Sequence, residues 1–261
     1  MIMAKKISWR FLKVWRRNLL TYQRIWKVNF ITPLLEPLLY ILAFGLGFSG
    51  MVEGVNYAGL ELTYTAFIAP ALIATAVMWN AFFETTYASF VRMYYHKILD
   101  GMLATPLTLE EIILAEVVWS ATKAFGAAVI MMTVLGLLGF VDFPSGLLIL
   151  PMAFLGGLAM GSIGMFFTGV TPTIDMFNLP IFLFITPMFL FSGTFFPVSN
   201  LPAWAQPFAL AFPLYHMVEL VRRFSLGASQ THPLVCMAYL LLFAMIFLYL
   251  AMRVMRKRLI N

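Results

Sequence analysis

Residues 92–116 read RMYYHKILDGMLATPLTLEEIILAE, a charged segment between two apolar runs that are each long enough to cross a bilayer. The second half of this segment carries the signal for a helix start. Thr108 followed three residues later by Glu111 fits a capping box, and Pro106 keeps the residue before it out of helical geometry. A new helix is therefore predicted to begin near Thr108.

The first half of the segment, residues 93–103, predicts a short helix that lies across the membrane surface. Helical spacing puts its larger apolar side chains on one face: Tyr94, Ile98 and either Met102 or Leu103. Lys97 and Asp100 fall elsewhere on the helix, and Gly101 and Pro106 weaken and end it. Such a helix is shaped to press on a neighbouring surface.

Composition places the whole chain in a membrane. Hydrophobic residues make up 62% of it and charged residues 11%, with a mean hydropathy of +0.91, whereas soluble proteins carry about 25% charged residues. Residues 1–30 are basic and amphipathic and lack the pattern of a signal peptide, so the N-terminus is expected in the cytoplasm. The net charge of +6 is concentrated near the chain ends, which favours inner-leaflet lipid over nucleic acid as a partner.

Residues 7–27 predict an amphipathic helix in the membrane interface. One side of a helical wheel carries apolar and aromatic residues: Leu12, Trp15, Leu19, Tyr22 and Trp26. The opposite side carries cations: Arg10, Lys13, Arg17, Arg24 and Lys27. The aromatic stripe favours contact with lipid headgroups, and a basic face packed on a soluble partner is the alternative. Both interpretations put the helix on the cytoplasmic side.

Six apolar runs near the ~20 residues of a transmembrane helix follow, so the predicted fold is an all-α integral membrane protein with six spans. The runs cover about 31–50, 64–90, 110–140, 146–170, 175–196 and 233–253. Basic residues gather before the first run and at the end of the last, while the connections 51–63 and 141–145 hold acidic residues and neither Lys nor Arg. The positive-inside rule therefore predicts that both termini and residues 92–109 are cytoplasmic.

Residues 197–232 are apolar but interrupted by four prolines, which argues against a seventh crossing. Asn200 before Pro202 resembles a helix start and Gly227 a helix stop, so two short re-entrant helices in the outer leaflet are predicted before the sixth span. The polar residues of this region are candidate site residues: His216, Glu219, Arg222 and Arg223. The arginines could hold anionic headgroups, pair with Glu219, or simply be hydrated at a helix end.

Three charges lie inside the predicted spans: Glu84, Glu116 and Lys123. Charges in lipid are costly and usually face protein or a substrate pathway. Glu116 and Lys123 are seven residues apart and share a helix face, and the lysine can extend toward Glu84. An ion-paired cluster in the inner half of the second and third spans is predicted, either as a structural lock or as part of a substrate path.

The fifth run, FLFITPMFLFSGTFFP at 182–197, is rich in Phe and Met and contains Pro187. Such soft, wide surfaces suit an amphiphilic ligand, but they are equally ordinary for helix packing and lipid contact. The candidate path residues are Met188, Phe189, Phe191 and Phe195. In the fourth run Gly157 and Gly161 form a GxxxG spacing, which indicates a close helix contact with an unidentified partner.

Motifs for chemistry are missing from the sequence. No G-x-x-x-x-G-K-[ST] phosphate loop occurs, so the chain is not expected to hold ATP by that route. His96, His216 and His232 are scattered over both sides of the membrane, and neither a Cys/His metal spacing nor a catalytic triad is apparent. No metal site is predicted, and an enzyme is the weaker class.

Four motifs carry a family resemblance: FVRMYY at 90–95, ATPLTLEEII at 104–113, TPTID at 171–175 and the aromatic run at 182–197. With this arrangement the chain resembles the permease subunit of type-2 ABC exporters, in particular the nodulation-type branch that exports lipo-oligosaccharides. The resemblance implies a homodimer of six-helix subunits in the bacterial inner membrane, with its dimer interface along the first and fifth spans. It also implies two copies of a separate ATPase subunit, which bind ATP and Mg, so that this chain holds no cofactor.

The resemblance implies further that a coupling helix in residues 92–106 receives the push of ATP binding and hydrolysis. The coupling residues would be Arg92, Tyr94, Tyr95, Lys97, Ile98, Asp100, Met102, Leu103 and Pro106. A multidrug or antibiotic efflux permease of the same family is one alternative. A stand-alone ion-coupled carrier or lipid-modifying enzyme is the alternative from another class, but a carrier should show inverted repeats and acids near the midplane, and neither is clear.

Overall fold

A computed structural model describes residues 8–24 and 54–259, with isolated positions 35, 39, 40, 42, 43 and 47 between them. The predicted first span at 31–50 lies outside the described residues except for those isolated positions. The described chain is helical apart from one small hairpin. Its α-helices and strands are α1 (Phe11–Arg24), β1 (Val55–Tyr57), β2 (Leu60–Leu62), α3 (Tyr64–Phe83), α4 (Ile98–Leu103), α5 (Leu109–Leu137), α6 (Ile149–Val170), α7 (Asn178–Pro180), α8 (Thr186–Phe191), α9 (Gln206–Ala211), α10 (Pro213–Leu226) and α11 (Pro233–Leu259).

Short π- and 3-10-helical turns extend several of these helices. The π turns are Glu84–Ala88, Val91–Tyr95 and Ile181–Ile185, and the 3-10 turns are Ser145–Leu148, Ile174–Phe177 and Val198–Asn200. With them, the described chain has five helices long and apolar enough to cross a membrane: Tyr64–Tyr95, Leu109–Leu137, Ser145–Val170, Ile174–Phe191 and Pro233–Leu259. They match five of the six predicted spans, but the first of them continues five residues beyond the predicted end at 90.

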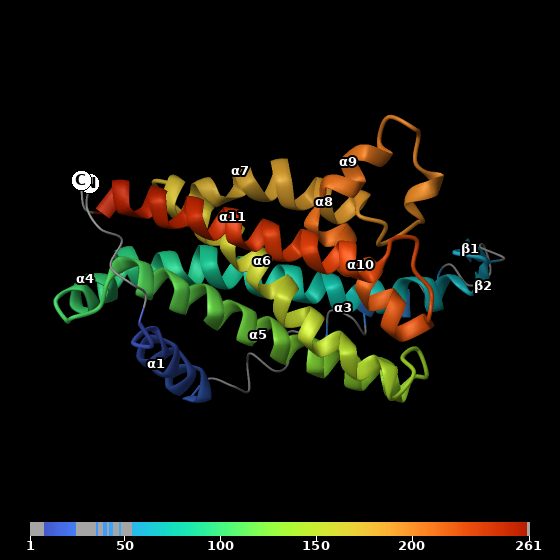
Figure 1. The fold of residues 1–261 in the computed structure, drawn as a ribbon, viewed down its shortest axis with the longest axis horizontal. Helices are drawn as coiled ribbons and strands as arrows, with labels where there is room; N and C mark the ends of the chain where they lie inside the picture. Colours follow the sequence, from blue (N-terminus) through green and yellow to red (C-terminus); the bar gives the residue numbers. More distant parts are fainter. Residues whose placement is uncertain are drawn as a thin grey trace.

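The long helices run side by side, and α6 contacts α3, α5, α10 and α11 (Figure 1). The predicted GxxxG pair explains one of these contacts. A Cβ on Gly157 would stand 2.8 Å from Ala121 Cα, and one on Gly161 would collide with the Ser120 side chain, so both glycines let α6 approach α5. The partner of the GxxxG face is therefore α5.

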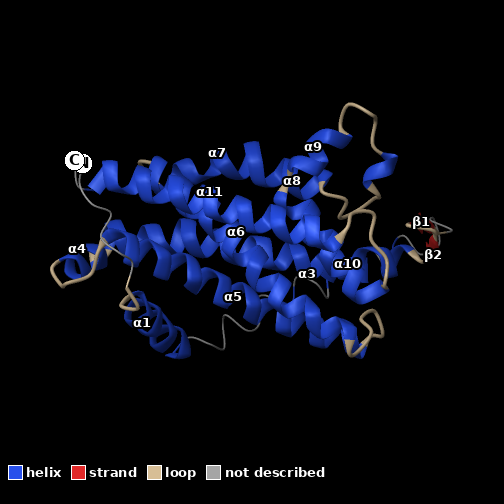
Figure 2. Ribbon diagram, viewed as in Figure 1, coloured by secondary structure: helices blue, strands red, loops and turns tan. Residues whose placement is uncertain are grey.

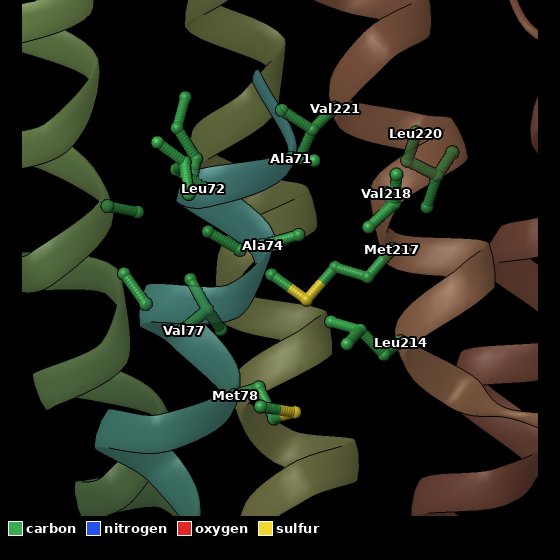
Figure 3. Close-up of a cluster of buried hydrophobic side chains, with 14 of the residues drawn as sticks. Ala71, Leu72, Ala74, Val77, Met78, Leu214, Met217, Val218, Leu220 and Val221 are labelled. Carbon is green, nitrogen blue, oxygen red and sulfur yellow. The ribbon is translucent and has the colours of Figure 1, made fainter. Parts of the chain in front are cut away.

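Part of the main apolar core lies where α10 packs on α3. Figure 3 shows Met217, Val218 and Val221 of α10 directed at Ala71, Ala74 and neighbouring side chains of α3. At ~1.5 Å per residue, the 14 residues of α10 reach only ~21 Å, less than the ~30 Å hydrocarbon core. The prediction that residues 197–232 make no simple crossing agrees with this length.

The two ends of the bundle differ in what they carry. In Figure 1, α1, α4 and the end of α11 gather at one end, here called the α4 end. The β1–β2 hairpin, α9 and α10 lie at the other, here called the hairpin end. Figure 2 shows the two strands of the hairpin, in which Val55 pairs with Leu62 and Tyr57 with Leu60. The hairpin was not predicted, because its turn residues Ala58 and Gly59 lack the Asn-Gly or Asp-Gly signal.

Several predicted helix boundaries hold and others are wrong. The capping box is confirmed: Thr108 caps α5, its hydroxyl accepts from the Glu111 N–H, and the Glu111 carboxylate accepts from the Thr108 N–H. Gly227 ends α10 with a φ of 73°, as predicted. Asn200 does not start a helix; it ends a 3-10 turn, and α9 begins at Gln206.

The predicted single helix over residues 93–103 is also wrong. The second span continues as a π turn to Tyr95, and Lys97, with a φ of 50°, breaks the chain before α4 begins at Ile98. A lysine at a positive φ carries no sequence signal, because that backbone region favours Gly and Asn. The fourth membrane-length helix, which corresponds to the predicted fifth span, ends at Phe191 instead of 196, before Gly193 turns the chain with a φ of 77°.

Candidate functional site

Five charged side chains meet at the α4 end between α1, α3 and α5, and we call them the charge cluster: Arg17, Glu84, Arg92, Glu116 and Lys123. Glu84, in the π turn after α3, is almost fully buried. Its carboxylate accepts from Arg92 Nη1 at 2.7 Å, from Lys123 Nζ at 2.8 Å and from Trp119 Nε1 at 3.0 Å. Three donors on a buried carboxylate compensate its loss of hydration.

Glu116, on α5, is 1% exposed and is held from two helices. Its Oε2 accepts from Ser89 Oγ at 2.8 Å and from Arg92 Nη2, and its Oε1 accepts from Asn18 Nδ2 of α1 at 3.1 Å. Arg92 therefore bridges two carboxylates and joins the end of the second span to α5. The resemblance placed Arg92 among the coupling residues, but its guanidinium points into the bundle.

Arg17 of α1 is the most loosely held member of the cluster. Its Nη2 is 3.7 Å from Glu116 Oε1, beyond hydrogen-bond distance, and its side chain is 33% exposed. Nη2 donates to Asn18 Oδ1 at 2.5 Å, and Nη1 lies 3.7 Å from the Met102 sulfur of α4. Burial lowers the pKa of Arg17 and the Glu116 carboxylate raises it, and the guanidinium stays charged at physiological pH.

A cavity of about 1120 Å³ adjoins the charge cluster. Its wall is formed by α1, the second span and α5, with His96 and Ile98 from the turn and the start of α4. Arg17, Glu84, Arg92 and Lys123 line it together with polar and aromatic side chains: Asn18, Thr21, Tyr22, Trp79, Asn80, Phe83, Tyr87 and Trp119. The cavity thus combines positive charge with aromatic surface.

Helix α1 and the residues before it are fixed to α5 and to the turn that leads into it. Ser8 donates to the Glu111 carboxylate at 2.7 Å, Arg10 donates to the Pro106 carbonyl at 2.9 Å, and Trp15 Nε1 donates to Thr122 Oγ1 at 3.0 Å. The helical wheel missed the inward face of α1, which carries Val14 and Asn18. Asn18 was overlooked because nothing in the neighbouring sequence shows that its amide donates to Glu116 and is buried there.

In α4 the apolar face points into the bundle. Leu99 is fully buried, and Tyr94, Met102 and Leu103 pack against the same cluster of apolar side chains. The exposed positions are instead Tyr95, Lys97, Asp100 and Pro106, while Ile98 is half-buried. The predicted apolar contact face is therefore an anchor, and polar side chains face outward.

Arg258, near the end of α11, makes a contact that the sequence analysis missed. Its guanidinium donates to the carbonyls of Thr168 and Thr171 at 3.0 and 2.5 Å and lies 4.4 Å from the ring centroid of Tyr94. It caps the end of α6 and touches the residues leading to α4. Cations often satisfy carbonyls at the end of their own helix, but the sequence could not show that Arg258 of α11 would satisfy those at the end of α6.

The hairpin end holds a second polar group, which we call the Arg222 group: Tyr57, Glu219 and Arg222. Arg222 is 1% exposed; it donates to the Phe67 carbonyl at 3.2 Å and lies over the Phe67 and Tyr57 rings, 3.8 and 5.0 Å from their centroids. This burial excludes a hydrated helix end. No ion pair with Glu219 occurs among the described residues.

Glu219 is satisfied by other donors. Its carboxylate accepts from Tyr57 Oη at 2.5 Å and from the Gln230 and Thr231 N–H groups at 2.6 and 3.1 Å. Burial and the Glu219 charge raise the pKa of Tyr57, which stays a neutral donor. The group ties the hairpin to α10 and to the loop before α11.

The other predicted residues of this region lie apart from the Arg222 group. Arg223 is exposed and donates to the Gly227 carbonyl at 2.6 Å. His216 is buried, with its Nε2 2.9 Å from the Leu210 carbonyl oxygen and its ring stacked on Tyr239. Neither side chain contributes to a cluster of ligands: among the described residues, no group of His, Cys, Asp or Glu could hold a metal ion.

The four candidate path residues do not share one surface. Met188 is fully buried in the main core, whereas Phe189, Phe191 and Phe195 are half-buried. Phe189 contacts Phe195 and Trp79, with ring centroids 5.0 and 6.4 Å apart. Trp79 lines the cavity, but none of the four candidate path residues does, and Met188 is better explained as core packing.

The bundle of five membrane-length helices defines a multi-pass membrane protein. The ABC-2 type transporter family model matches residues 10–226. The chain therefore belongs to the ABC-2 type transporter family, whose members are transporter subunits that work with ABC ATPase partners.

Relatives of similar length support the same assignment. The chain is 35% identical over 253 residues to Nodulation protein J of Sinorhizobium fredii, covering 97% of this chain and 95% of the relative. It is 37% identical over 258 residues to Nodulation protein J of Rhizobium leguminosarum bv. trifolii, with the same coverage. A probable multidrug ABC transporter permease of Escherichia coli is 25% identical over 170 residues, 64% of this chain and 46% of that protein.

Proposed function

We propose that the chain is the membrane permease subunit of an ATP-driven exporter and that separate ATPase subunits drive it through residues 92–106. Membership of the ABC-2 type transporter family supports the first part. The geometry of α4 supports the second, because Leu99 anchors this helix while Tyr95, Lys97 and Asp100 face outward. These outward residues would contact an ATPase subunit, which would hold the ATP and Mg.

The charge cluster would transmit movement of α4 to the spans. Arg92 lies five residues before Lys97 and bridges Glu84 to Glu116, so a displacement of the turn pulls on both the second span and α5. Arg17 and Arg10 connect α1 to the same segment through Met102 and Pro106. The bridge by Arg92 is the observation that carries this proposal.

The proposed topology has six spans, with the first within residues 31–50 and both termini in the cytoplasm of a bacterial cell. The basic residues at the α4 end support this orientation in the inner membrane. Residues 197–232 would re-enter the outer leaflet, consistent with the short helices α9 and α10. A second copy of the chain and membrane lipids would be the remaining partners.

The proposed cargo is an amphiphile of the lipo-oligosaccharide kind. Full-length similarity to proteins named Nodulation protein J supports this choice. Efflux of drugs is the second candidate, supported by the partial match to a probable multidrug permease. Both cargoes would be driven through the same segment.

The test replaces Lys97 and Asp100 by Ala in the chain reconstituted with its ATPase subunit. Both side chains are exposed, so insertion should be unaffected, while ATP-dependent transport and co-purification of the ATPase should be lost. Asp142→Ala removes an exposed aspartate at the hairpin end and is the matched control. Met102→Pro, which removes a hydrogen bond of α4, should have the same effect, whereas proline at Ile98 is less informative because the first helical residue tolerates it. Unchanged transport in the double variant would refute the proposal.

A further inference from the structure

The charge cluster is not electrically balanced. It brings together three cations, Arg17, Arg92 and Lys123, and two carboxylates, Glu84 and Glu116. One positive charge is thus in excess among the described residues of this site. The cavity beside these charges is therefore net positive, which favours an anionic ligand over a neutral one.

The excess charge is localised on Arg17. Arg92 and Lys123 each make an ion pair within hydrogen-bond distance, whereas Arg17 Nη2 stays 3.7 Å from Glu116 Oε1. Arg17 also lines the cavity and keeps a third of its side chain exposed. It therefore has donor capacity directed at the cavity, since a guanidinium carries five N–H groups.

Arg92 lines the same cavity but offers it no free donor. Its terminal nitrogens already donate to Glu84, Ser89 and Glu116. Its Nε has no partner in the described chain, but it is buried and therefore closed to a ligand in the cavity. Arg17 is thus the cation of the cluster whose N–H groups can reach such a ligand.

The rest of the wall suits the body of an amphiphile. Trp79 stacks on Phe83 with centroids 5.1 Å apart, and Tyr22 packs edge-on against Trp119 at 5.6 Å. Aromatic faces accept acyl chains and the apolar faces of sugar rings. The volume of about 1120 Å³ exceeds the upper range of ordinary ligand pockets, ~1,000 Å³, so a headgroup and part of a lipid chain fit.

We propose that this cavity binds an anionic amphiphile, with Arg17 contacting a phosphate or sulfate group and the aromatic wall contacting the apolar body. The anion is either the headgroup of a membrane phospholipid or a charged group on the cargo. The second case deepens the proposed function and rests on it. Binding is nevertheless measurable without the ATPase subunit, so failure here and failure of transport coupling are separate results.

The test titrates the purified chain in detergent with phosphatidylglycerol or phosphatidylcholine carrying brominated acyl chains, which quench tryptophan fluorescence. Quenching that Trp79→Phe reduces reports on the cavity. Phosphatidylglycerol should bind at least about tenfold more tightly than phosphatidylcholine. Both headgroups carry a phosphate, but the choline cation of phosphatidylcholine cancels its charge and is repelled by the excess positive charge of the site. A sulfated short-chain glycolipid is the competitor: displacement below the concentration of phosphatidylglycerol assigns the anion to the cargo, and the reverse order assigns it to the membrane.

The variants decide whether Arg17 is the anion ligand. Arg17→Gln should remove the preference for phosphatidylglycerol, and Arg17→Lys should keep most of it. Arg16→Gln makes the same change of net charge on the exposed face of α1 and should have no effect. Equal binding of both lipids to the wild type, without displacement by the sulfated glycolipid, or a preference that Arg17→Gln leaves intact, would overturn the proposal.

A further control concerns carboxylates outside the described residues. Glu36 is one of them. If Glu36→Gln increases affinity for phosphatidylglycerol, a carboxylate of the chain itself occupies the anion position, and the proposal is wrong. Unchanged affinity in this variant supports an external anion.

Discussion

At the α4 end Arg92 bridges two carboxylates beside a cavity, whereas at the hairpin end Arg222 is enclosed by main-chain carbonyls and aromatic rings. The first arrangement joins three helices through side chains that can exchange partners. In the second, main-chain groups fix the arginine and its neighbour Glu219. The α4 end is thus held by side-chain ion pairs, whereas the hairpin end is held by main-chain groups that resist movement.

The largest expected effect on stability is at the hairpin end. Arg222→Met leaves the Phe67 carbonyl without its side-chain donor and the buried Glu219 without a nearby cation, so the free energy of unfolding should fall by about 3–5 kcal/mol. Thermal unfolding in detergent measures it. Arg223→Gln, at the exposed neighbouring position, is the control and should change stability little. Equal effects of both substitutions would remove the distinction between the two ends.

Within the charge cluster, substitutions of the two partners of one ion pair, Glu84 and Lys123, should reduce stability and transport by different amounts. Glu84→Gln leaves both Arg92 and Lys123 short of a carboxylate and should cost about 2–3 kcal/mol together with most ATP-dependent transport. Lys123→Gln should cost less, because Glu84 keeps its bonds from Arg92 and Trp119. Unfolding and transport assays on the same preparations compare them, and a more harmful Lys123→Gln would contradict the proposed network.

Contact between α5 and α6 connects the two ends, and Gly157 tests how closely it is packed. A Cβ at this position would lie 2.8 Å from Ala121 Cα, so Gly157→Ala must separate the helices and should cost about 1–3 kcal/mol. Gly126→Ala on α5 meets no described atom within 4 Å and should be neutral or slightly stabilising. Thermal unfolding that ranks the two variants the other way would refute the packing argument.

The smallest effects should come from the last turn of α11. Arg258→Gln loses several carbonyl contacts at the end of α6 and should cost about 1–2 kcal/mol. Arg256→Gln, two residues away, removes a largely exposed ion pair with Glu110 and should cost less than about 1 kcal/mol. Similar thermal midpoints for both variants would show that the carbonyl contacts of Arg258 at the end of α6 stabilise the fold no more than the ion pair of Arg256 does.

The local and periodic features of this fold could be predicted from the sequence. Five spans, the capping box at Thr108 and the stop at Gly227 follow from hydropathy and cap chemistry, which act within a few residues. The Glu84–Lys123 pairing could also be predicted, because charges are costly in lipid and must find partners. Features that depend on contacts between residues far apart in the chain could not be predicted.

The failures share that cause. The break at Lys97 and the inward face of α4 are imposed by packing, as Leu99 seats among side chains from α1, α5, α6 and α11. Arg92 was assigned outward because nothing local shows that Ser89 and Glu116 enclose its guanidinium. Arg258 reaches carbonyls roughly 90 residues earlier in the chain, a separation that no sequence window can detect.

Cysteine accessibility at the two ends tests the central claim, that the chain is driven from the cytoplasm through the segment at the α4 end. In a Cys236→Ser background, Tyr95→Cys and Trp204→Cys place a thiol at positions 64% and 69% exposed, one at each end. A membrane-impermeant maleimide should label the Tyr95→Cys variant only in inside-out vesicles, and bound ATPase subunit should protect it; the Trp204→Cys variant should be labelled only in right-side-out membranes. Labelling of the Tyr95→Cys variant from the exterior would contradict the account, because no cytoplasmic ATPase could then contact α4.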